Sequence, residues 1–600
     1  MNFRVASLAF AAQSILSNVA ASSLPTVDLG YSVHQATLNN KSSGPDSYFN
    51  FSNIRFGQAP VGPLRFSAPL APEGRNETVN DGQQSVICPQ ANPEWIINQE
   101  SFILAYLLGS NTSKYTNSTT STTATSSTSL PTPAPGTSED CLFLDVIVPE
   151  KIFNSGNAKR KRQEGPYAVQ CQPGSPCTEV SVPQNGTETS GAPVLVWIFG
   201  GGYVEGSKVS YGNPAGLVAR SLEDDNEGLI YVAMNYRLGL FGWLSAVENV
   251  TANVGLLDQR LALDWVQKNI HLFGGDPSRV TVMGESAGAG SIMHHITAHG
   301  GNGSIPFQQA IPQSPAFQPL VPVESQTIFE EVMGNASLLA NTSITSAEQL
   351  RELPFDVLFA ANTLITARSQ YGQFTFGPAI DPSNNSYVPD LPIKLLARGE
   401  YHNVSILVGH NSDEGLLFTP PYIQTQGDFE QLAMVTFPTA NSTLVDTIVD
   451  VLYPPVFNGS YGYSDQIGRT AIIIADFIVG CNAHSLAATL TFAYAYLFDV
   501  PPGLHGEDSD YTFFNGDTST SDDGLPVNAT VAEAFQRYLV NFAMTGLPTS
   551  KGYDDFVRYG SNDSVSNIGL TASKFGTHIK DPAARSQCTF WQEAPYDVET

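Results

Sequence analysis

The stretch RVTVMGESAGAG, residues 279–290, decides the fold of this 600-residue chain. Its first five residues suit a short buried strand, and AGAGSIMHHITAHG (287–300) is predicted to be a helix. Between them, GESAG (284–288) matches the pattern G-x-S-x-G. Small residues let a strand turn sharply into a helix and expose a serine at the tip. We therefore predict a nucleophile elbow between strand 279–283 and the helix from 287, with Ser286 as the nucleophile.

Strand and helix patterns alternate along the rest of the chain. Residues 258–273 carry apolar side chains at helical spacing. Short apolar runs, as expected of strands buried on both faces, occupy 193–199, 228–237, 404–410 and 492–500. Apolar strands that alternate with helices indicate an α/β fold with a mostly parallel central sheet flanked by helices.

Three consecutive glycines, Gly200 to Gly202, directly follow the predicted strand 193–199. Attack of a serine on an ester carbonyl creates an oxyanion that backbone N–H groups must stabilise, and glycine lets the backbone approach closely. We therefore expect this loop to supply N–H groups to the reacting oxygen.

A serine hydroxyl is a weak nucleophile, so it needs a base, and the base needs an orienting carboxylate. In an open α/β sheet, such groups lie beyond the carboxyl ends of strands. Asp413 and Glu414 follow the predicted strand 404–410, and Asp499 lies at the end of the predicted strand 492–500. The residues alone leave these three acids as alternatives.

Three histidines follow the acid-bearing loop in the sequence. His484 lies within an apolar helical run, and His578 lies in a polar C-terminal stretch. His505, in PPGLHG (501–506), directly follows a predicted strand and has a glycine next to it. We predict that His505 is the base.

Two other reactive side chains receive no catalytic role. Glu285 is adjacent to Ser286 in the sequence, which we interpret as too close to orient the base. His295 and His299 are four residues apart, a zinc-binding spacing, but no glutamate lies between them as a metalloprotease motif requires. We expect no metal site.

The N-terminus predicts secretion. Residues 1–21 combine Arg4, a short apolar run and the small residues Val19-Ala20-Ala21, as in a signal peptide. The segment 471–490 is the best later candidate for a membrane span, but it contains polar residues and is predicted to be a buried helix, so we expect no integral membrane segment in the mature chain. More than a dozen N-x-S/T sequons predict a glycosylated surface, among them Asn40, Asn50, Asn76, Asn111, Asn117, Asn185, Asn249, Asn302, Asn335 and Asn341.

Charge and cysteine content agree with an extracellular protein. The formal charge of −28 argues against nucleic-acid binding, which needs a basic face. Six cysteines allow three disulfides. Cys171 and Cys177 are close together in a Gly/Pro-rich loop, so we expect a local pair there.

Two segments are predicted to be insertions. Residues 110–138 are mostly Ser, Thr, Pro and Ala, which is typical of a flexible, O-glycosylated stalk. Residues 154–190 are predicted to form a loop. This loop contains KRKR (159–162), which we interpret as a solvated segment, with a processing site as the alternative.

Several stretches resemble the type-B carboxylesterase/lipase family, which includes cholinesterases and secreted fungal lipases. The resemblance spans most of the chain after residue 21. It is carried by FSNIRFGQAPVGPLRF (51–66), SEDCLFLDV (138–146), NYRLGLFG (235–242), the long stretch 258–290 and CTFW (588–591). The chain is most similar to the secreted fungal members, and the resemblance implies a single α/β-hydrolase catalytic domain over 22–600.

The resemblance also implies roles for individual residues. Ser286 would be the nucleophile, Glu414 the acid and His505 the base. The oxyanion hole would be formed by the N–H groups of Gly201, Gly202 and Ala287. The implied disulfides are Cys88–Cys141, which would close a lid loop that contains the Ser/Thr tract, and Cys481–Cys588.

These observations predict a secreted, extracellular carboxylic ester hydrolase that uses a Ser-His-Glu triad and an acyl-enzyme intermediate. The expected partner is a small-molecule or lipid ester, no cofactor is expected, and the sequence specifies no oligomeric state. Two alternatives remain from the sequence: a triacylglycerol lipase that acts at interfaces, and a non-catalytic, cholinesterase-like adhesion module.

Overall fold

The structure is a computed structural model of the chain. It describes residues 24–39, 47–112, 114–115, 130–163, 169–170, 178–179, 191–245, 249–516, 521–522, 525–560, 562–571 and 574–595. The predicted signal peptide, most of the Ser/Thr tract and the expected Cys171–Cys177 pair lie outside these ranges.

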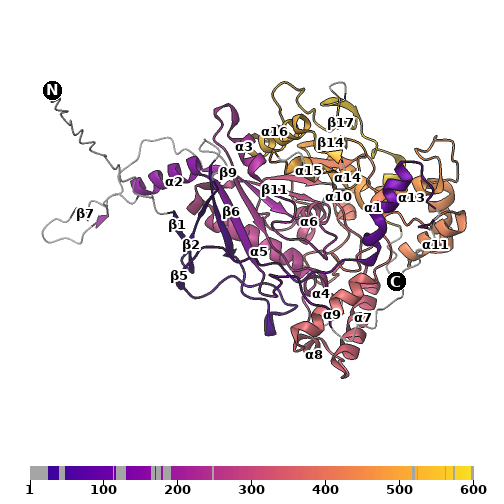
Figure 1. The fold of residues 1–600 in the computed structure, drawn as a ribbon, viewed down its shortest axis with the longest axis horizontal. Helices are drawn as coiled ribbons and strands as arrows, with labels where there is room; N and C mark the ends of the chain where they lie inside the picture. Colours follow the sequence, from indigo (N-terminus) through magenta and orange to yellow (C-terminus); the bar gives the residue numbers. More distant parts are fainter. Residues whose placement is uncertain are drawn as a thin grey trace, which may run out of the picture.

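One sheet of eleven strands organises the molecule (Figure 1). Its central strands, from β10 across to β17, are parallel, and antiparallel strands extend the sheet at both edges. The predicted α/β class and the mostly parallel sheet are therefore confirmed, whereas the antiparallel edges were not predicted. Across the sheet the order is β18 (Thr577–Lys580), β17 (Ser564–Gly569), β14 (Ala493–Asp499), β13 (Ser405–Asn411), β12 (Gln309–Gln313), β11 (Gly275–Glu285), β9 (Ala192–Ile198), β10 (Ile230–Met234), β6 (Phe143–Pro149), β4 (Tyr48–Arg55) and β3 (Thr37–Asn39).

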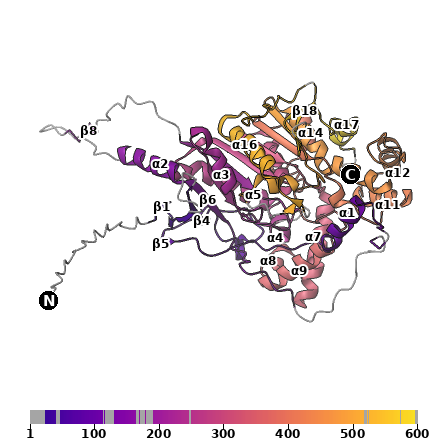
Figure 2. The ribbon, with the colours of Figure 1, turned by 45° about the horizontal axis from the view of Figure 1, so that its top comes forward.

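Helices cover both faces of this sheet. Every residue of β9 and β10 is buried, as the continuous apolar runs predicted. On one face lie α3 (Ala215–Ser221) and α16 (Ala529–Thr545), and on the other lie α5 (Val254–Asn269), α6 (Ala287–Ile296) and α14 (Cys481–Thr489) (Figures 1 and 2).

The helix after the elbow is shorter than predicted. The prediction extended it to residue 300, but α6 ends at Ile296 and a 3-10 turn, Ala298–Gly301, follows. His299 and Gly300 have φ angles of 53° and 63°, in the left-handed region that ends a right-handed helix.

The apolar segment near 471–490 is a core element. It forms α13 (Gln466–Ala475), a π turn (Asp476–Gly480) and α14. By length and composition, Gln466–Thr489 could cross a membrane, but 67% of its most apolar window is buried inside the protein. The buried carboxylate of Asp476 accepts a hydrogen bond of 2.8 Å from Tyr453, so burial inside the protein, as predicted, explains its polar residues.

The predicted loop over 154–190 begins as a helix. Residues 154–163 continue α2 (Glu150–Gln163), so this part of the loop prediction is wrong. Ile152 and Phe153 are buried in the first turn of α2, and this anchor starts the helix before the polar stretch. Two short antiparallel strands, β7 (Val169–Gln170) and β8 (Thr178–Glu179), lie further along the insertion.

Several helices build walls beside the carboxyl ends of the strands. On the right of Figure 1 lie α1 (Gln99–Leu107), α11 (Gln426–Thr436) and α13, and below them lie α7 (Pro322–Ala340) and α9 (Phe355–Ala367).

The disulfides Cys88–Cys141 and Cys481–Cys588 are both present, as the family resemblance implied.

Candidate active site

Ser286 lies at the turn between β11 and α6. Its φ and ψ are 53° and −123°, a strained conformation for a residue with a side chain. Gly284 and Gly288 flank the turn, and a Cβ at Gly288 would lie 2.0 Å from the carbonyl oxygen of Ile198. The predicted nucleophile elbow is thus confirmed, and the two glycines are required because β9 lies directly against the turn.

The structure brings Ser286, His505 and Glu414 together. Ser286 Oγ lies 2.8 Å from His505 Nε2, and His505 Nδ1 lies 2.5 Å from a carboxylate oxygen of Glu414. Glu414 follows β13 and His505 follows β14, so the carboxyl ends of neighbouring strands place both side chains beside the elbow.

The competing residues from the sequence lie in other interactions. Asp499 forms a salt bridge of 2.6 Å with Lys574. His484 Nδ1 is 2.7 Å from the hydroxyl of Tyr559, and His578 lies on β18. Asp413 is adjacent to Glu414, but it is Glu414 that hydrogen-bonds His505.

Two residues that the sequence did not indicate hold Glu414. Its second carboxylate oxygen accepts hydrogen bonds from Ser314 Oγ (2.7 Å) and from the backbone N–H of Asn411 (2.5 Å). Both residues lie at strand ends, but β12, which precedes Ser314, was not predicted. Their position at the end of a strand is the sequence signal that could have indicated Ser314 and Asn411 as candidate site residues.

The two charged partners shift each other's pKa. Burial alone would raise the pKa of Glu414, but the charge of His505 and its hydrogen bond outweigh burial and lower it. Burial alone would lower the pKa of His505, but the charge of Glu414 and its hydrogen bond raise it. A carboxylate that favours the protonated imidazole supports a base that must accept a proton during the reaction.

Glu285 lies closer to the base than its sequence position suggested. Its Oε1 is 3.4 Å from His505 Nε2, the nitrogen that faces Ser286, whereas Glu414 hydrogen-bonds the other ring nitrogen, Nδ1. The side chain is 1% exposed, and burial raises its pKa to about 8, so the carboxyl group is mostly protonated at neutral pH. Glu285 also explains Gly200, since a Cβ there would lie 2.8 Å from Glu285 Oε2.

Two of the three expected oxyanion donors lie beside the cavity at Ser286. Gly202 and Ala287 line a cavity together with Ser286. Within the described residues, the N–H groups of Gly201, Gly202 and Ala287 donate no hydrogen bond to another protein group. A Cβ at Gly202 would lie 2.3 Å from the Phe374 ring, so only glycine fits there.

Aromatic side chains surround the cavity at Ser286. The ring centroids of Phe418 and His505 are 5.0 Å apart. Trp95, from the loop closed by Cys88–Cys141, packs against Phe418 and Phe374 at 6.3 and 5.5 Å between centroids. This covering role of Trp95 was not indicated by the sequence, because loop residues far from the elbow carry no periodic pattern.

The two histidines four residues apart make structural hydrogen bonds, His295 from α6 and His299 from the 3-10 turn that follows. Both ring nitrogens of His295 are occupied, by the hydroxyl of Tyr387 (2.6 Å) and the side chain of Gln259 (2.9 Å). His299 Nδ1 lies 2.9 Å from the carbonyl oxygen of Ser386. Among the described residues, no cluster of three or more His, Cys, Asp or Glu side chains could hold a metal ion.

The serine lies at a strand-to-helix turn and hydrogen-bonds a histidine. An acid from a neighbouring strand end holds that histidine. On a mostly parallel sheet, this arrangement defines an α/β-hydrolase. The carboxylesterase family profile matches residues 36–591, so the chain belongs to the carboxylesterase family.

Curated relatives and solved structures agree with this membership. The chain is 39% identical to carboxylesterase patB of Penicillium expansum over 96% of this chain and 97% of that protein. It is 28% identical to secreted lipase 1 of Botryotinia fuckeliana, over 88% and 87% of the two chains. The crystal structure of Aspergillus niger EstA matches with a TM-score of 0.71 at 23% identity, covering 96% of this chain and 99% of that one. The protein is thus an ester hydrolase, and these relatives do not support the non-catalytic adhesion module.

Proposed function

We propose that the protein is a secreted carboxylic ester hydrolase with Ser286 as nucleophile, His505 as base and Glu414 as the orienting acid. The observation that carries this proposal is the continuous hydrogen-bonded chain from Ser286 Oγ through the imidazole to Glu414, with distances of 2.8 and 2.5 Å. The distance of 2.8 Å lies within the range of about 2.6–3.2 Å expected of a working nucleophile–base pair.

The reaction proceeds in two halves. His505 Nε2 takes the proton of Ser286 as Oγ attacks the ester carbonyl, and the N–H groups of Gly201, Gly202 and Ala287 bind the oxyanion. The protonated His505 then donates its proton to the leaving alcohol, which leaves an acyl-enzyme on Ser286. Water, activated by His505, repeats the attack and releases the acid.

The substitution Ser286→Ala tests the proposal. We expect the rate of p-nitrophenyl acetate hydrolysis to fall by at least ~10⁴-fold, because the acyl-enzyme can no longer form. Ser278→Ala is a matched control, since Ser278 is an exposed serine on the same strand, β11. Undiminished turnover by Ser286→Ala would contradict the assignment.

Secretion is part of the proposal. Residues 1–21 carry the signal-peptide pattern, and both described disulfides need an oxidising compartment. The relative from Botryotinia fuckeliana is named a secreted lipase. Mass spectrometry of the protein from culture medium should find an N-terminus that begins after residue 21. An intact Met1 on the active protein would contradict cleavage.

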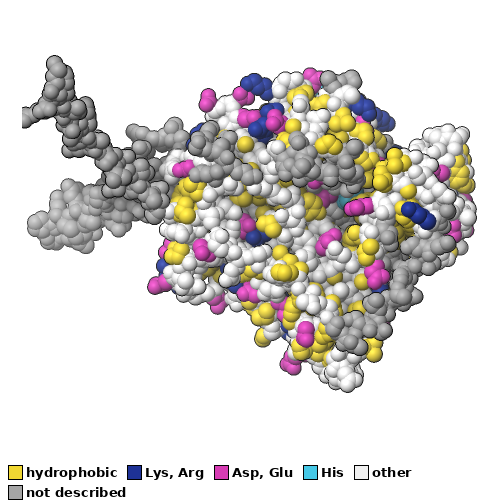
Figure 3. Space-filling view, viewed as in Figure 1, with side chains coloured by type: hydrophobic (Ala, Val, Ile, Leu, Met, Phe, Trp, Pro, Cys, Tyr) yellow, Lys and Arg dark blue, Asp and Glu magenta, His cyan; other side chains and the backbone are white. Residues whose placement is uncertain are grey.

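A lipase that acts at lipid–water interfaces is a second candidate, because the loop closed by Cys88–Cys141 exposes apolar side chains. Ile97 and Leu108 are 77% and 71% exposed, and Leu104 and Leu107 on α1 are also exposed. Apolar side chains gather on this side of the molecule (Figure 3). A rate that rises sharply when one triglyceride passes its solubility limit would support the lipase, and a rate that follows dissolved substrate only would exclude it.

A further inference from the structure

The cavity at Ser286 is small and mostly apolar. Its volume is about 30 Å³, and Phe317, Phe374 and Phe418 lie in its wall. By the same measure, one water molecule needs about 10–15 Å³. This inner cavity therefore has room for a short apolar segment of a substrate and no more.

A second and larger cavity begins where the first ends. Its volume is about 430 Å³, within the range of about 300–1,000 Å³ that is usual for small-molecule sites. It is lined by α7, the loop 368–376, α11 and α13. The two cavities share Gln318, Gly372, Phe376, Phe418 and Ile478 as wall residues.

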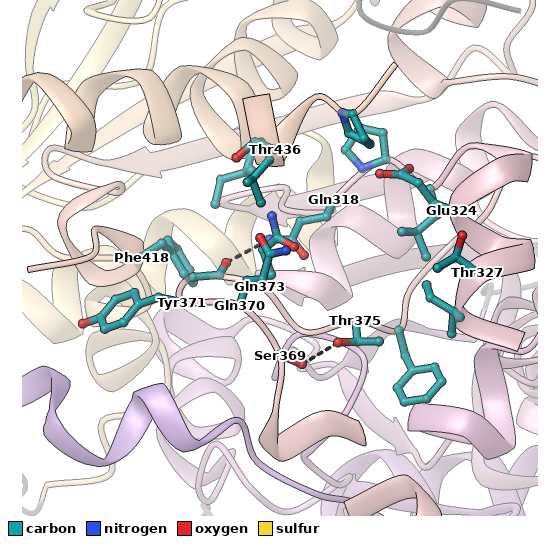
Figure 4. A pocket seen from close by; sticks show the side chains of 18 of the residues that line it. Gln318, Glu324, Thr327, Ser369, Gln370, Tyr371, Gln373, Thr375, Phe418 and Thr436 are labelled. Carbon is teal, nitrogen blue, oxygen red and sulfur yellow. Dashed lines mark hydrogen bonds between the residues drawn. The ribbon is translucent and has the colours of Figure 1, made fainter. Parts of the chain in front are cut away.

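Polar side chains surround this outer cavity (Figure 4). Ser369 and Thr375 hydrogen-bond each other at 2.6 Å, as the dashed line in Figure 4 shows. Among the described residues, the side chains of Gln370, Gln373 and Thr436 make no hydrogen bond within the protein. Their amide and hydroxyl groups are therefore available to a ligand.

Gln318 fixes the boundary between the two cavities. Its side-chain amide donates a hydrogen bond of 2.8 Å to the carbonyl oxygen of Gly372 and accepts one of 3.3 Å from the N–H of Phe374. Both partners belong to the loop 368–376, so Gln318 holds this loop against the inner cavity. In Figure 4, Thr436 lies on one side of Gln318 and Gln373, and Ser369 lies on the other.

The residues at the start of the inner cavity indicate which end of the ester the two cavities receive. The leaving oxygen must lie beside His505 Nε2 to receive its proton. The inner cavity is lined by Ser286, Ala287 and Gly202, the residues expected at the acyl carbonyl, and Phe418, in the wall of both cavities, packs against His505. Because the inner cavity begins at these residues, we assign both cavities to the acyl part of the ester.

We propose that the outer cavity binds the far end of the acyl group, and that this end carries a neutral hydrogen-bonding function such as a hydroxyl, carbonyl or amide. A short apolar segment would cross the inner cavity between this function and the ester carbonyl. The function is neutral because the wall offers mainly amides and hydroxyls, and its charged side chains have both signs: Glu324, Glu331 and Arg368. This inference rests on the proposed esterase function.

The test compares p-nitrophenyl 6-hydroxyhexanoate with p-nitrophenyl heptanoate, in which a methyl group replaces the terminal hydroxyl. We expect kcat/KM to be about tenfold higher for the hydroxy ester, since the outer cavity satisfies the hydroxyl. The double variant Gln373→Leu/Thr436→Val should bring this ratio close to one and leave p-nitrophenyl acetate hydrolysis unchanged, because acetate does not reach the outer cavity. Gln431→Leu, an exposed glutamine on α11 outside the cavity, should change neither value.

Three results would overturn the inference. The first is a heptanoate ester that is hydrolysed as fast as the hydroxy ester. The second is a double variant that keeps the preference. The third is a preference that appears only when the hydroxyl is moved to the alcohol part, as in 6-hydroxyhexyl acetate compared with heptyl acetate. A wild-type enzyme that does not hydrolyse p-nitrophenyl acetate would instead contradict the proposed esterase function itself.

Discussion

Gly288 shows how a single missing side chain fixes the geometry of the site. A Cβ at this position would lie 2.0 Å from the carbonyl oxygen of Ile198, which is backbone and cannot rotate away. We expect Gly288→Ala to lower the free energy of unfolding by about 3 kcal/mol, measured by urea denaturation. Gly334, on α7, is the control: a Cβ there meets nothing within 4 Å, so Gly334→Ala should be neutral or slightly stabilising. Equal effects of the two substitutions would contradict the packing argument.

The buried carboxyl group of Glu285 should make stability depend on pH. Its pKa rises from an ordinary 4.5 to about 8, so between these values the folded protein keeps a proton that the unfolded chain has lost. The contribution of Glu285 to the free energy of unfolding therefore falls by about 1.4 kcal/mol for each pH unit as the pH rises through this window. The glutamine in Glu285→Gln cannot ionise. We therefore expect the urea midpoint of this variant, relative to that of the wild type, to rise between pH 5 and pH 8. A constant difference between the two proteins would contradict a raised pKa.

The sequence predicted the residues of the site better than their contacts. Ser286 and His505 follow from the elbow pattern and from a glycine-flanked strand end, but physics alone left Asp413, Glu414 and Asp499 open until the family resemblance favoured Glu414. The position of the Glu285 side chain beside His505 was not predicted, because distance along the sequence does not show how the turn directs a side chain. In the structure, the strained turn directs Ser286 and Glu285 toward the same imidazole.

At the level of elements, the prediction was most accurate where strands are buried on both faces. The apolar run 193–199 corresponds to β9 (Ala192–Ile198), and 404–410 corresponds to β13. The strands β4 and β17, each one place in from an edge of the sheet, were not predicted, because polar residues interrupt their apolar side chains. Tertiary pairing, and not local pattern, defines such strands.

The disulfide Cys481–Cys588 ties the C-terminal helix α17 (Ser586–Glu593) to α14. It links residues 107 positions apart. Closing a loop of this length removes conformational entropy from the unfolded chain, so we expect the double variant Cys481→Ser/Cys588→Ser to lose about 4–5 kcal/mol of unfolding free energy. Urea denaturation of the wild type and the variant under non-reducing conditions measures this loss. Identical midpoints would show that the disulfide adds nothing to the packing of α17.

At the scale of the whole molecule, the surface fits an extracellular glycoprotein. Acidic side chains outnumber basic ones by 56 to 28, and Figure 3 shows them spread over the visible face. The sequon residues Asn76, Asn111, Asn249, Asn302 and Asn341 are exposed, so an oligosaccharyltransferase could modify them without unfolding the protein. After treatment of the secreted protein with peptide N-glycosidase, we expect peptide mass spectrometry to find aspartate at several of these positions. Unmodified asparagine at all of them would contradict the prediction.

The central claim is that this carboxylesterase-family protein works through Ser286. The most direct measurement is to treat the active enzyme with a fluorophosphonate, which phosphonylates activated serines, and to locate the label by peptide mass spectrometry. We predict one label per molecule, on Ser286 in the peptide that contains GESAG, with esterase activity lost in proportion to labelling. A label on another residue that accompanies the loss of activity, or full activity after complete labelling of Ser286, would contradict the account.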